Sequence, residues 1–186
     1  MSQPLGNAVG NSLEVMEAIE VLKGKGPKDI TELAEILAGA MIYLGGKASS
    51  LTEGHDMAKE ALKSGKGLLK FKEFVECQGG NPDVIEDYSL FKQPTIKESM
   101  ISEKAGYVSA IEARLIGLAS QHTGAGRGKK EDQIDLSAGI YLHKKVGDRV
   151  EKGEVLADFY GNDTVKIGNA LKEAKKAFTI SETKPE

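Results

Sequence analysis

The pattern of apolar and polar positions changes part-way along the chain. Up to about residue 80, apolar residues recur at helical spacing and glycines end each run, which predicts four short helices. After about residue 100, short apolar runs alternate with turn residues, which is typical of strands. The expected helices cover residues 11–23, 29–44, 52–63 and 68–77, and the expected strands cover 106–111, 115–120 and 134–142.

Helix-capping residues and turn glycines support these elements. Asn11 with Glu14, and Asp29 with Glu32, fit capping boxes at the starts of the first two helices. Residues 146–156 predict two further short strands joined by turns, in which Gly147 and Gly153 supply the positive φ angles. A final helix is expected over 165–178, residues 1–12 are expected to form a loop, and the last six residues to fray.

These elements predict an α+β fold. The expected organisation is a helical segment over residues 1–80, an irregular linker over 81–100, and a β-rich domain with a closing helix over 101–186. The second helix is apolar on nearly all sides, so it is expected to be buried. Three neighbouring helices do not obviously supply that much cover, which hints at missing parts.

Composition narrows the class of protein. The chain has 186 residues, a net charge of −3 and a pI near 5.8, which argues against a nucleic-acid-binding surface. Cys77 is the only cysteine, so a reducing cytoplasm is the expected setting. The sequence contains no apolar run long enough to cross a bilayer and no signal pattern. We therefore expect a soluble cytoplasmic protein with no membrane or nucleic-acid partner.

Candidate chemistry is sparse. His55, His122 and His143 lie far apart without metal-ligand spacing, so each is expected to be a surface or hydrogen-bonding residue. The glycine-rich segment 124–128 permits a phosphate cradle, or alternatively a flexible turn that carries Arg127 to a neighbour. The flexible turn is favoured, because a strand rather than a helix is expected to follow. These residues alone make up no complete active site.

The segment 146–156 resembles the strand–turn–strand unit of barrel-sandwich hybrid domains, the fold of lipoyl and biotinyl carriers. Such carriers present a lysine at a hairpin tip, which would fall here near Arg114. Arginine cannot be acylated in that way. The alternative function is therefore a barrel-sandwich-hybrid binding or carrier module without an acceptor lysine.

A second resemblance covers nearly the whole chain. The opening thirty-odd residues, the QGGN step at 78–81 and the block from 106 to 155 are similar to bacterial pyrimidine nucleoside phosphorylases, of the thymidine phosphorylase family. Within the last block, GAGR, KED, IDL, GI and HKK follow one another in the family's order. The chain therefore resembles the C-terminal part of such an enzyme.

The resemblance implies a pentosyltransferase reaction, in which phosphate cleaves a pyrimidine nucleoside to the free base and a pentose 1-phosphate. It also implies a homodimer whose subunits contain a small α domain and a large α/β domain, to which this piece would belong. The family's phosphate and base sites precede Met1 and have no counterpart here. We expect the chain to be inactive alone, and one alternative is a subunit that associates with a separately made N-terminal half.

One family site is implied in part. Bacterial members bind a structural cation, potassium or calcium, and the positions that match its ligands are Leu5 and Ala8, through backbone carbonyls, and Glu17, through its carboxylate. Hard cations prefer such oxygen ligands. The cation is not expected to be required for folding. The alternative for Glu17 is a solvated residue on the acidic stripe of the first helix.

Overall fold

The computed structural model describes residues 2–185, which form two compact units. One unit contains the residues up to Glu14 and those from Phe91 onward, and the other contains Val15–Leu90. Helices dominate the second unit and antiparallel sheets dominate the first, so the predicted α+β class is confirmed. No helix within these residues is long and apolar enough to span a bilayer.

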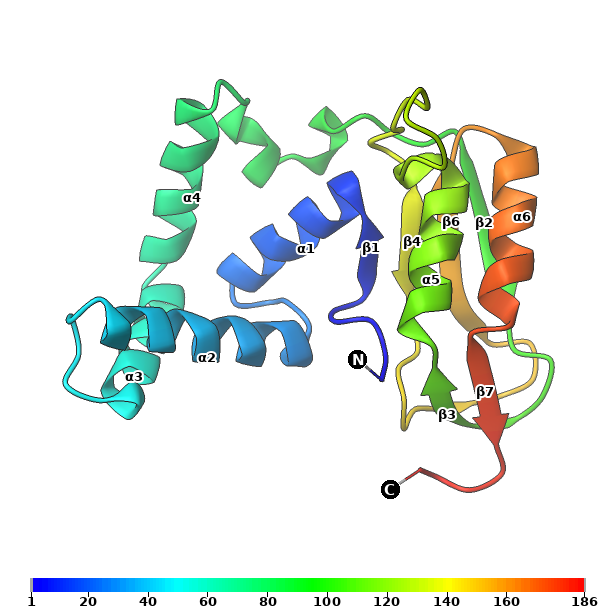
Figure 1. Cartoon of the computed structure of the whole chain (residues 1–186), viewed down its shortest axis with the longest axis horizontal. Helices are drawn as coiled ribbons and strands as arrows, with labels where there is room; N and C mark the ends of the chain where they lie inside the picture. Colours follow the sequence, from blue (N-terminus) through cyan, green and yellow to red (C-terminus); the bar gives the residue numbers. More distant parts are fainter. Residues whose placement is uncertain (1, 186) are drawn as a thin grey trace. The chain divides into compact units, whose positions relative to one another are not determined.

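The first unit is built on two antiparallel sheets (Figure 1). The larger sheet has the order β1-β4-β6-β2, with bounds Ala8–Gly10, Gly139–Leu142, Val155–Gly161 and Ile96–Ile101. The smaller sheet has the order β5-β3-β7, with bounds Arg149–Val150, Gly106–Ile111 and Phe178–Ser181. Strands far apart in the chain therefore become neighbours, as where β1 pairs with β4.

Apolar side chains from both sheets form the core of this unit. Helices α5 (Ala113–Ser120) and α6 (Thr164–Lys175) contribute Ile116 and Ile167, and a π-helical turn, η3 (Gln121–Ala125), follows α5 directly. Phe159 on β6 and Ile140 on β4 are fully buried. Side chains alternate between the faces of a strand, so Asp158 beside Phe159 points to the opposite face of the sheet.

The second unit consists of helices (Figure 1). Their bounds are α1 Asn11–Leu22, α2 Lys28–Leu44, α3 Leu51–Lys63 and α4 Lys66–Cys77, followed by the 3₁₀ turns η1 Pro82–Ile85 and η2 Tyr88–Leu90. Helices α2 and α3 approach closely where two glycines meet. A Cβ at Gly54 would lie 2.3 Å from the carbonyl oxygen of Gly39, so only glycine permits this spacing.

Four helices and the turns of the 146–156 segment agree with the sequence pattern. Gly147 and Gly153 have φ angles of 95° and 88°, as the predicted turns require. Capping differs in detail, because the Glu14 carboxylate accepts the N–H of Gly10 rather than that of Asn11. The cap of α2 is Pro27, so the prediction that Asp29 caps this helix is wrong.

Four other predictions are also wrong. Residues 115–120 are helical rather than extended, because a short apolar run fits either structure and here it covers the core as α5. Residues 1–12 are not all loop, since they include β1, and the expected linker over 81–100 contains most of β2. The final helix ends at Lys175, and Phe178 begins β7.

The unit boundaries fall after residues 14 and 90, whereas the sequence pattern places them at 80 and 100. The difference comes from long-range pairing. The strand β1 belongs to the β-rich unit because it pairs with β4, and β2 belongs there because it pairs with β6. The sequence pattern does not show that β1 pairs with β4 or that β2 pairs with β6.

The expected burial of the second helix is not observed. Along α2, Ile36, Leu37, Met41 and Leu44 are 50–81 % exposed, and Gly39 is its only buried residue. Leu37, Met41 and Leu44 follow one another at spacings of four and three residues, so they lie along one side of the helix, and Ile36 directly precedes Leu37. We call these four residues the α2 apolar stripe.

Candidate functional site

The residues predicted to hold a cation lie in both units. Leu5 and Ala8 belong to the first unit, where Leu5 is 38 % exposed and Ala8 is buried in β1 opposite Tyr141. Glu17 belongs to the second unit and is only 7 % exposed, so the alternative of a solvated acidic residue is wrong. The cation site itself stays a prediction. Within residues 2–185, no cluster of three or more His, Cys, Asp or Glu side chains could hold a metal ion.

The opening loop is fastened by a positive charge. The ammonium of Lys145 donates to the carbonyl oxygens of Pro4 and Gly6, and the N–H of Val146 donates to the side chain of Gln3 at 2.8 Å. These bonds direct loop carbonyls toward a cationic group, although they use residues 4 and 6 rather than 5 and 8. Oxygen donors of this kind suit a hard cation.

A buried carboxylate joins three strands on one face of the larger sheet. Asp158 on β6 is 3 % exposed, and it accepts hydrogen bonds from Ser99 on β2 at 2.6 Å and from His143 after β4 at 2.8 Å. The ammonium of Lys97 lies 2.9 Å from the same carboxylate. We call these four residues the Asp158 cluster.

The electrostatics of the Asp158 cluster favour the ionised acid. Burial alone would raise the pKa of the Asp158 carboxyl, but the hydrogen bonds from Ser99, Lys97 and His143 outweigh it and lower the pKa to about 2. The carboxylate in turn raises the pKa of the Lys97 ammonium, chiefly through their hydrogen bond. The ion pair of Lys97 and Asp158 therefore connects β2 with β6, and the hydrogen bond of His143 connects β6 with the residue that follows β4.

The Asp158 cluster has the residue types of a hydrolase triad but not its order of contacts. In a triad the histidine lies between the serine and the acid, so that it can take the serine proton. Here Asp158 lies between Ser99 and His143. The arrangement holds strands together and activates no nucleophile. Sequence reasoning missed Asp158, although one acid within the otherwise uncharged strand VLADFYG was a usable signal.

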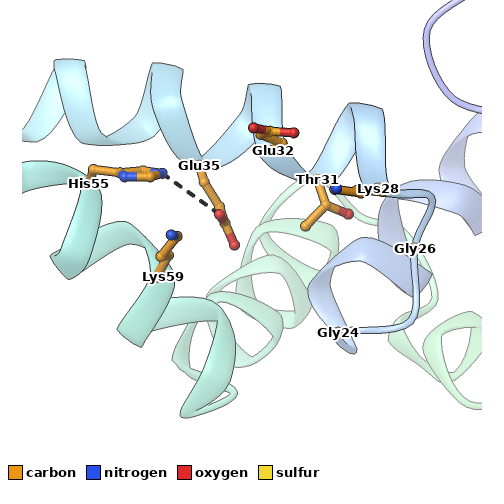
Figure 2. A pocket seen from close by; sticks show the side chains of 8 residues that line it. All are labelled: Gly24, Gly26, Lys28, Thr31, Glu32, Glu35, His55 and Lys59. Carbon is orange, nitrogen blue, oxygen red and sulfur yellow. Dashed lines mark ion pairs between the residues drawn. The ribbon is translucent and has the colours of Figure 1, made fainter.

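The second unit contains a cavity of about 330 Å³ between α2, α3 and the loop at Gly24–Gly26. Figure 2 shows Glu35 projecting from α2 toward His55 and Lys59 of α3. The Nε2 atom of His55 lies 3.7 Å from Glu35 Oε2, and this buried nitrogen makes no hydrogen bond among the described residues.

The chemistry open to this cavity is limited. His55 offers a ring nitrogen and Glu35 offers a carboxylate to a polar ligand. The lining includes two carboxylates, Glu32 and Glu35, and two ammonium groups, Lys28 and Lys59. The formal charges of these four groups cancel.

Two family profiles match the chain. Residues 1–68 match the family described as "Glycosyl transferase family, a/b domain", and residues 107–181 match "Pyrimidine nucleoside phosphorylase C-terminal domain". The first match covers β1 and the first three helices, and the second covers the smaller sheet, α5, α6, and strands β4 and β6 of the larger sheet.

Individual proteins agree with the profiles. The chain is 49 % identical to a pyrimidine-nucleoside phosphorylase of Bacillus subtilis, over 97 % of this chain and 44 % of the relative. It is also 49 % identical to the Geobacillus stearothermophilus enzyme of the same name, over 87 % of this chain and 37 % of the relative. For the Staphylococcus epidermidis protein of that name the identity is 46 %, over 97 % and 41 % of the two lengths.

The chain thus spans less than half the length of these curated relatives. Both family matches lie in this one chain, and the chain is also 49 % identical to a pyrimidine-nucleoside phosphorylase. Over the length that it spans, the chain belongs to the pyrimidine-nucleoside phosphorylases, of which it carries part of the a/b domain and the C-terminal domain.

Proposed function

We propose that this chain works as the C-terminal part of a pyrimidine-nucleoside phosphorylase and has no activity alone. The reaction of the whole enzyme would transfer the pentose of a pyrimidine nucleoside to phosphate, releasing the free base and a pentose 1-phosphate. The observation that carries the proposal is the 49 % identity to the Bacillus subtilis enzyme across 97 % of this chain.

The α2 apolar stripe supports the need for a further part. Ile36, Leu37, Met41 and Leu44 expose a contiguous line of large side chains, which soluble proteins normally cover. An a/b domain, as the matched family is described, packs helices onto a β-sheet. Within the described part of this match, residues 2–68, the structure has helices and the single strand β1. We infer that a sheet supplied by the remainder of the domain covers the stripe.

We also propose that Leu5, Ala8 and Glu17 contribute oxygen ligands to a structural potassium or calcium ion in the whole enzyme. The buried carboxylate of Glu17 and the fastened, carbonyl-rich opening loop fit a hard cation. When bound, the ion would link backbone carbonyls to a carboxylate and so hold the loop, with no part in bond cleavage. The whole enzyme is proposed to be a cytoplasmic homodimer.

Complementation tests the proposal. The purified chain is mixed with uridine and phosphate, and uracil release is followed with and without a second polypeptide that carries the part of the Bacillus subtilis relative outside the matched segment. We expect no turnover by either polypeptide alone and measurable uracil release from the mixture. Enzyme-like turnover by this chain alone would disprove the inactivity, and two halves that bind without turnover would disprove the assignment of the reaction.

The carrier alternative gains no support from the geometry. Arg114 lies in the first turn of α5, so the position expected for a modified hairpin tip is helical.

A further inference from the structure

A second cavity, of about 500 Å³, lies within the β-rich unit between the η3 turn, the loop that follows it, and helix α6. Its polar lining includes Gln121 and His122 from η3 and Asn169 from α6. Two lysines of α6, Lys166 and Lys172, also line it. The volume lies in the ordinary range for small-molecule sites.

The acidic groups of this cavity are already engaged. One oxygen of Asp132 accepts the N–H groups of Gly128 and Lys129 at 3.0 and 2.8 Å, and chiefly the bond from Lys129 lowers the pKa of this carboxyl. Glu173 is paired with Lys176 at 2.8 Å, and this hydrogen bond lowers the pKa of the Glu173 carboxyl. Both acids thus remain ionised, and each is bound to donors of the protein.

The basic groups are not engaged in the same way. Across the described part of the chain, the ammonium groups of Lys166 and Lys172 donate no hydrogen bond and form no ion pair, although Lys166 lies near enough to lower the pKa of Asp132. The amide of Asn169 is equally without a hydrogen bond there. The cavity therefore offers two cationic donors and a neutral donor to whatever enters it.

Gly124 brings the backbone of η3 next to Lys166. Gly124 has a φ angle of 108°, which disfavours any other residue, and a Cβ at this position would lie 3.8 Å from the Nζ of Lys166. The backbone of η3 and the side chain of Lys166 therefore border the same cavity.

We propose that this cavity binds a phosphoryl group, with Lys166 and Lys172 as its charge partners and Asn169 and His122 as further hydrogen-bonding groups. Two ammonium groups match a dianion better than they match a singly charged carboxylate, and lysine binds phosphate as a point charge. A bare phosphate ion would occupy only part of about 500 Å³, so the space also accommodates the body of a phosphorylated small molecule. The proposal does not depend on the proposed enzymatic function.

The test is a binding titration of the 186-residue chain, followed by NMR of its backbone amides. The probes are inorganic phosphate, glycerol 3-phosphate and, as the uncharged counterpart, glycerol. We expect both phosphate probes to shift amides of η3 and of α6 between Lys166 and Lys172, with a dissociation constant of about 1 mM or lower. Tighter binding of glycerol 3-phosphate would identify a phosphorylated molecule as the ligand, and equal binding would identify the phosphate ion.

Matched variants separate the cavity from general surface charge. Lys166→Gln and Lys172→Gln should each weaken binding about threefold to tenfold, because each removes one charged donor. Lys175→Gln is the control, since Lys175 lies on the same helix, pairs with Glu103 and does not line the cavity. Failure of both phosphate probes to bind, or an equal loss in the Lys175→Gln variant, would overturn the proposal.

Discussion

The two units of this protein bury apolar surface to very different extents. In the β-rich unit Phe159, Ile140 and Leu142 are fully buried between sheets and helices that all belong to the unit. In the helical unit Met41 and Leu44 on α2 are 72 % and 81 % exposed. The β-rich unit encloses its own core, whereas the helical unit leaves large apolar side chains exposed. Closure of a core is therefore a property of each unit and not of the chain as a whole.

The largest expected effect comes from truncating one large apolar side chain in each unit and comparing the losses of stability. Phe159→Ala should lower the free energy of unfolding of the β-rich unit by about 3–5 kcal/mol, because it leaves a cavity in a closed core. Urea denaturation, followed by spectroscopic probes in each unit, measures the loss. Met41→Ala is the matched change and should cost about 0.5 kcal/mol or less, since its side chain is exposed. Equal losses would mean that the two cores do not differ.

The second effect concerns the packing of α2 on α3. Gly54→Ala should destabilise the helical unit by about 3 kcal/mol, because the new Cβ meets a backbone oxygen that cannot move without separating the helices. Gly168→Ala on α6 is the control, since a Cβ there meets nothing within 4 Å. Alanine is also the better helix former, so this control should gain up to about 1 kcal/mol. Thermal unfolding of both variants is the measurement, and an unaffected Gly54→Ala protein would contradict the close contact.

The third effect is a pH dependence confined to the β-rich unit. The pKa of Asp158 is lowered from 3.8 to about 2 in the folded state, so its contribution is fully present above about pH 4. This contribution, about 2 kcal/mol, is lost as the pH falls from about 4 toward about 2. Urea denaturation between pH 7 and pH 2 measures it.

Asp158→Asn supplies the control for that experiment. The variant keeps the shape of the side chain but cannot ionise, so its stability should depend less on pH across the same interval. A wild-type profile identical to that of the variant would show that the Asp158 cluster does not stabilise the fold through its charge.

The smallest effect on stability should come from the α2 apolar stripe. The double variant Met41→Gln, Leu44→Gln should change the free energy of unfolding of the chain by about 0.5 kcal/mol or less, because both side chains are exposed. The same variant should reduce binding to the complementing polypeptide, which isothermal titration calorimetry measures. Unchanged binding would mean that the stripe is not the covered face.

The sequence predicted best where a feature is local. Gly147 and Gly153 were assigned to turns from their neighbours alone, and their positive φ angles agree. The helices α3 and α4 were placed to within two residues, because glycine and serine mark their ends. The strand β3 was predicted with its observed bounds.

Prediction failed where an element depends on a distant partner. The short strand β1 follows a polar, glycine-rich loop and exists because β4 lies beside it. Residues 115–120 fit a strand or a helix equally well, and the core below them selects the helix. The Asp158 cluster needs strands β2 and β6 in register, with Ser99 opposite Asp158 and Lys97 opposite Tyr160. No local pattern reports that register.

By itself, the sequence determined the α+β class, the four helices before residue 80, the turns at Gly147 and Gly153, and the resemblance to one enzyme family, because each follows from residue spacing and local backbone preference. Only the tertiary structure decided which strands pair, that Glu17 is buried, and that Lys166 and Lys172 border one cavity. Those features depend on contacts between residues far apart in the chain, and such contacts form only when the whole unit folds.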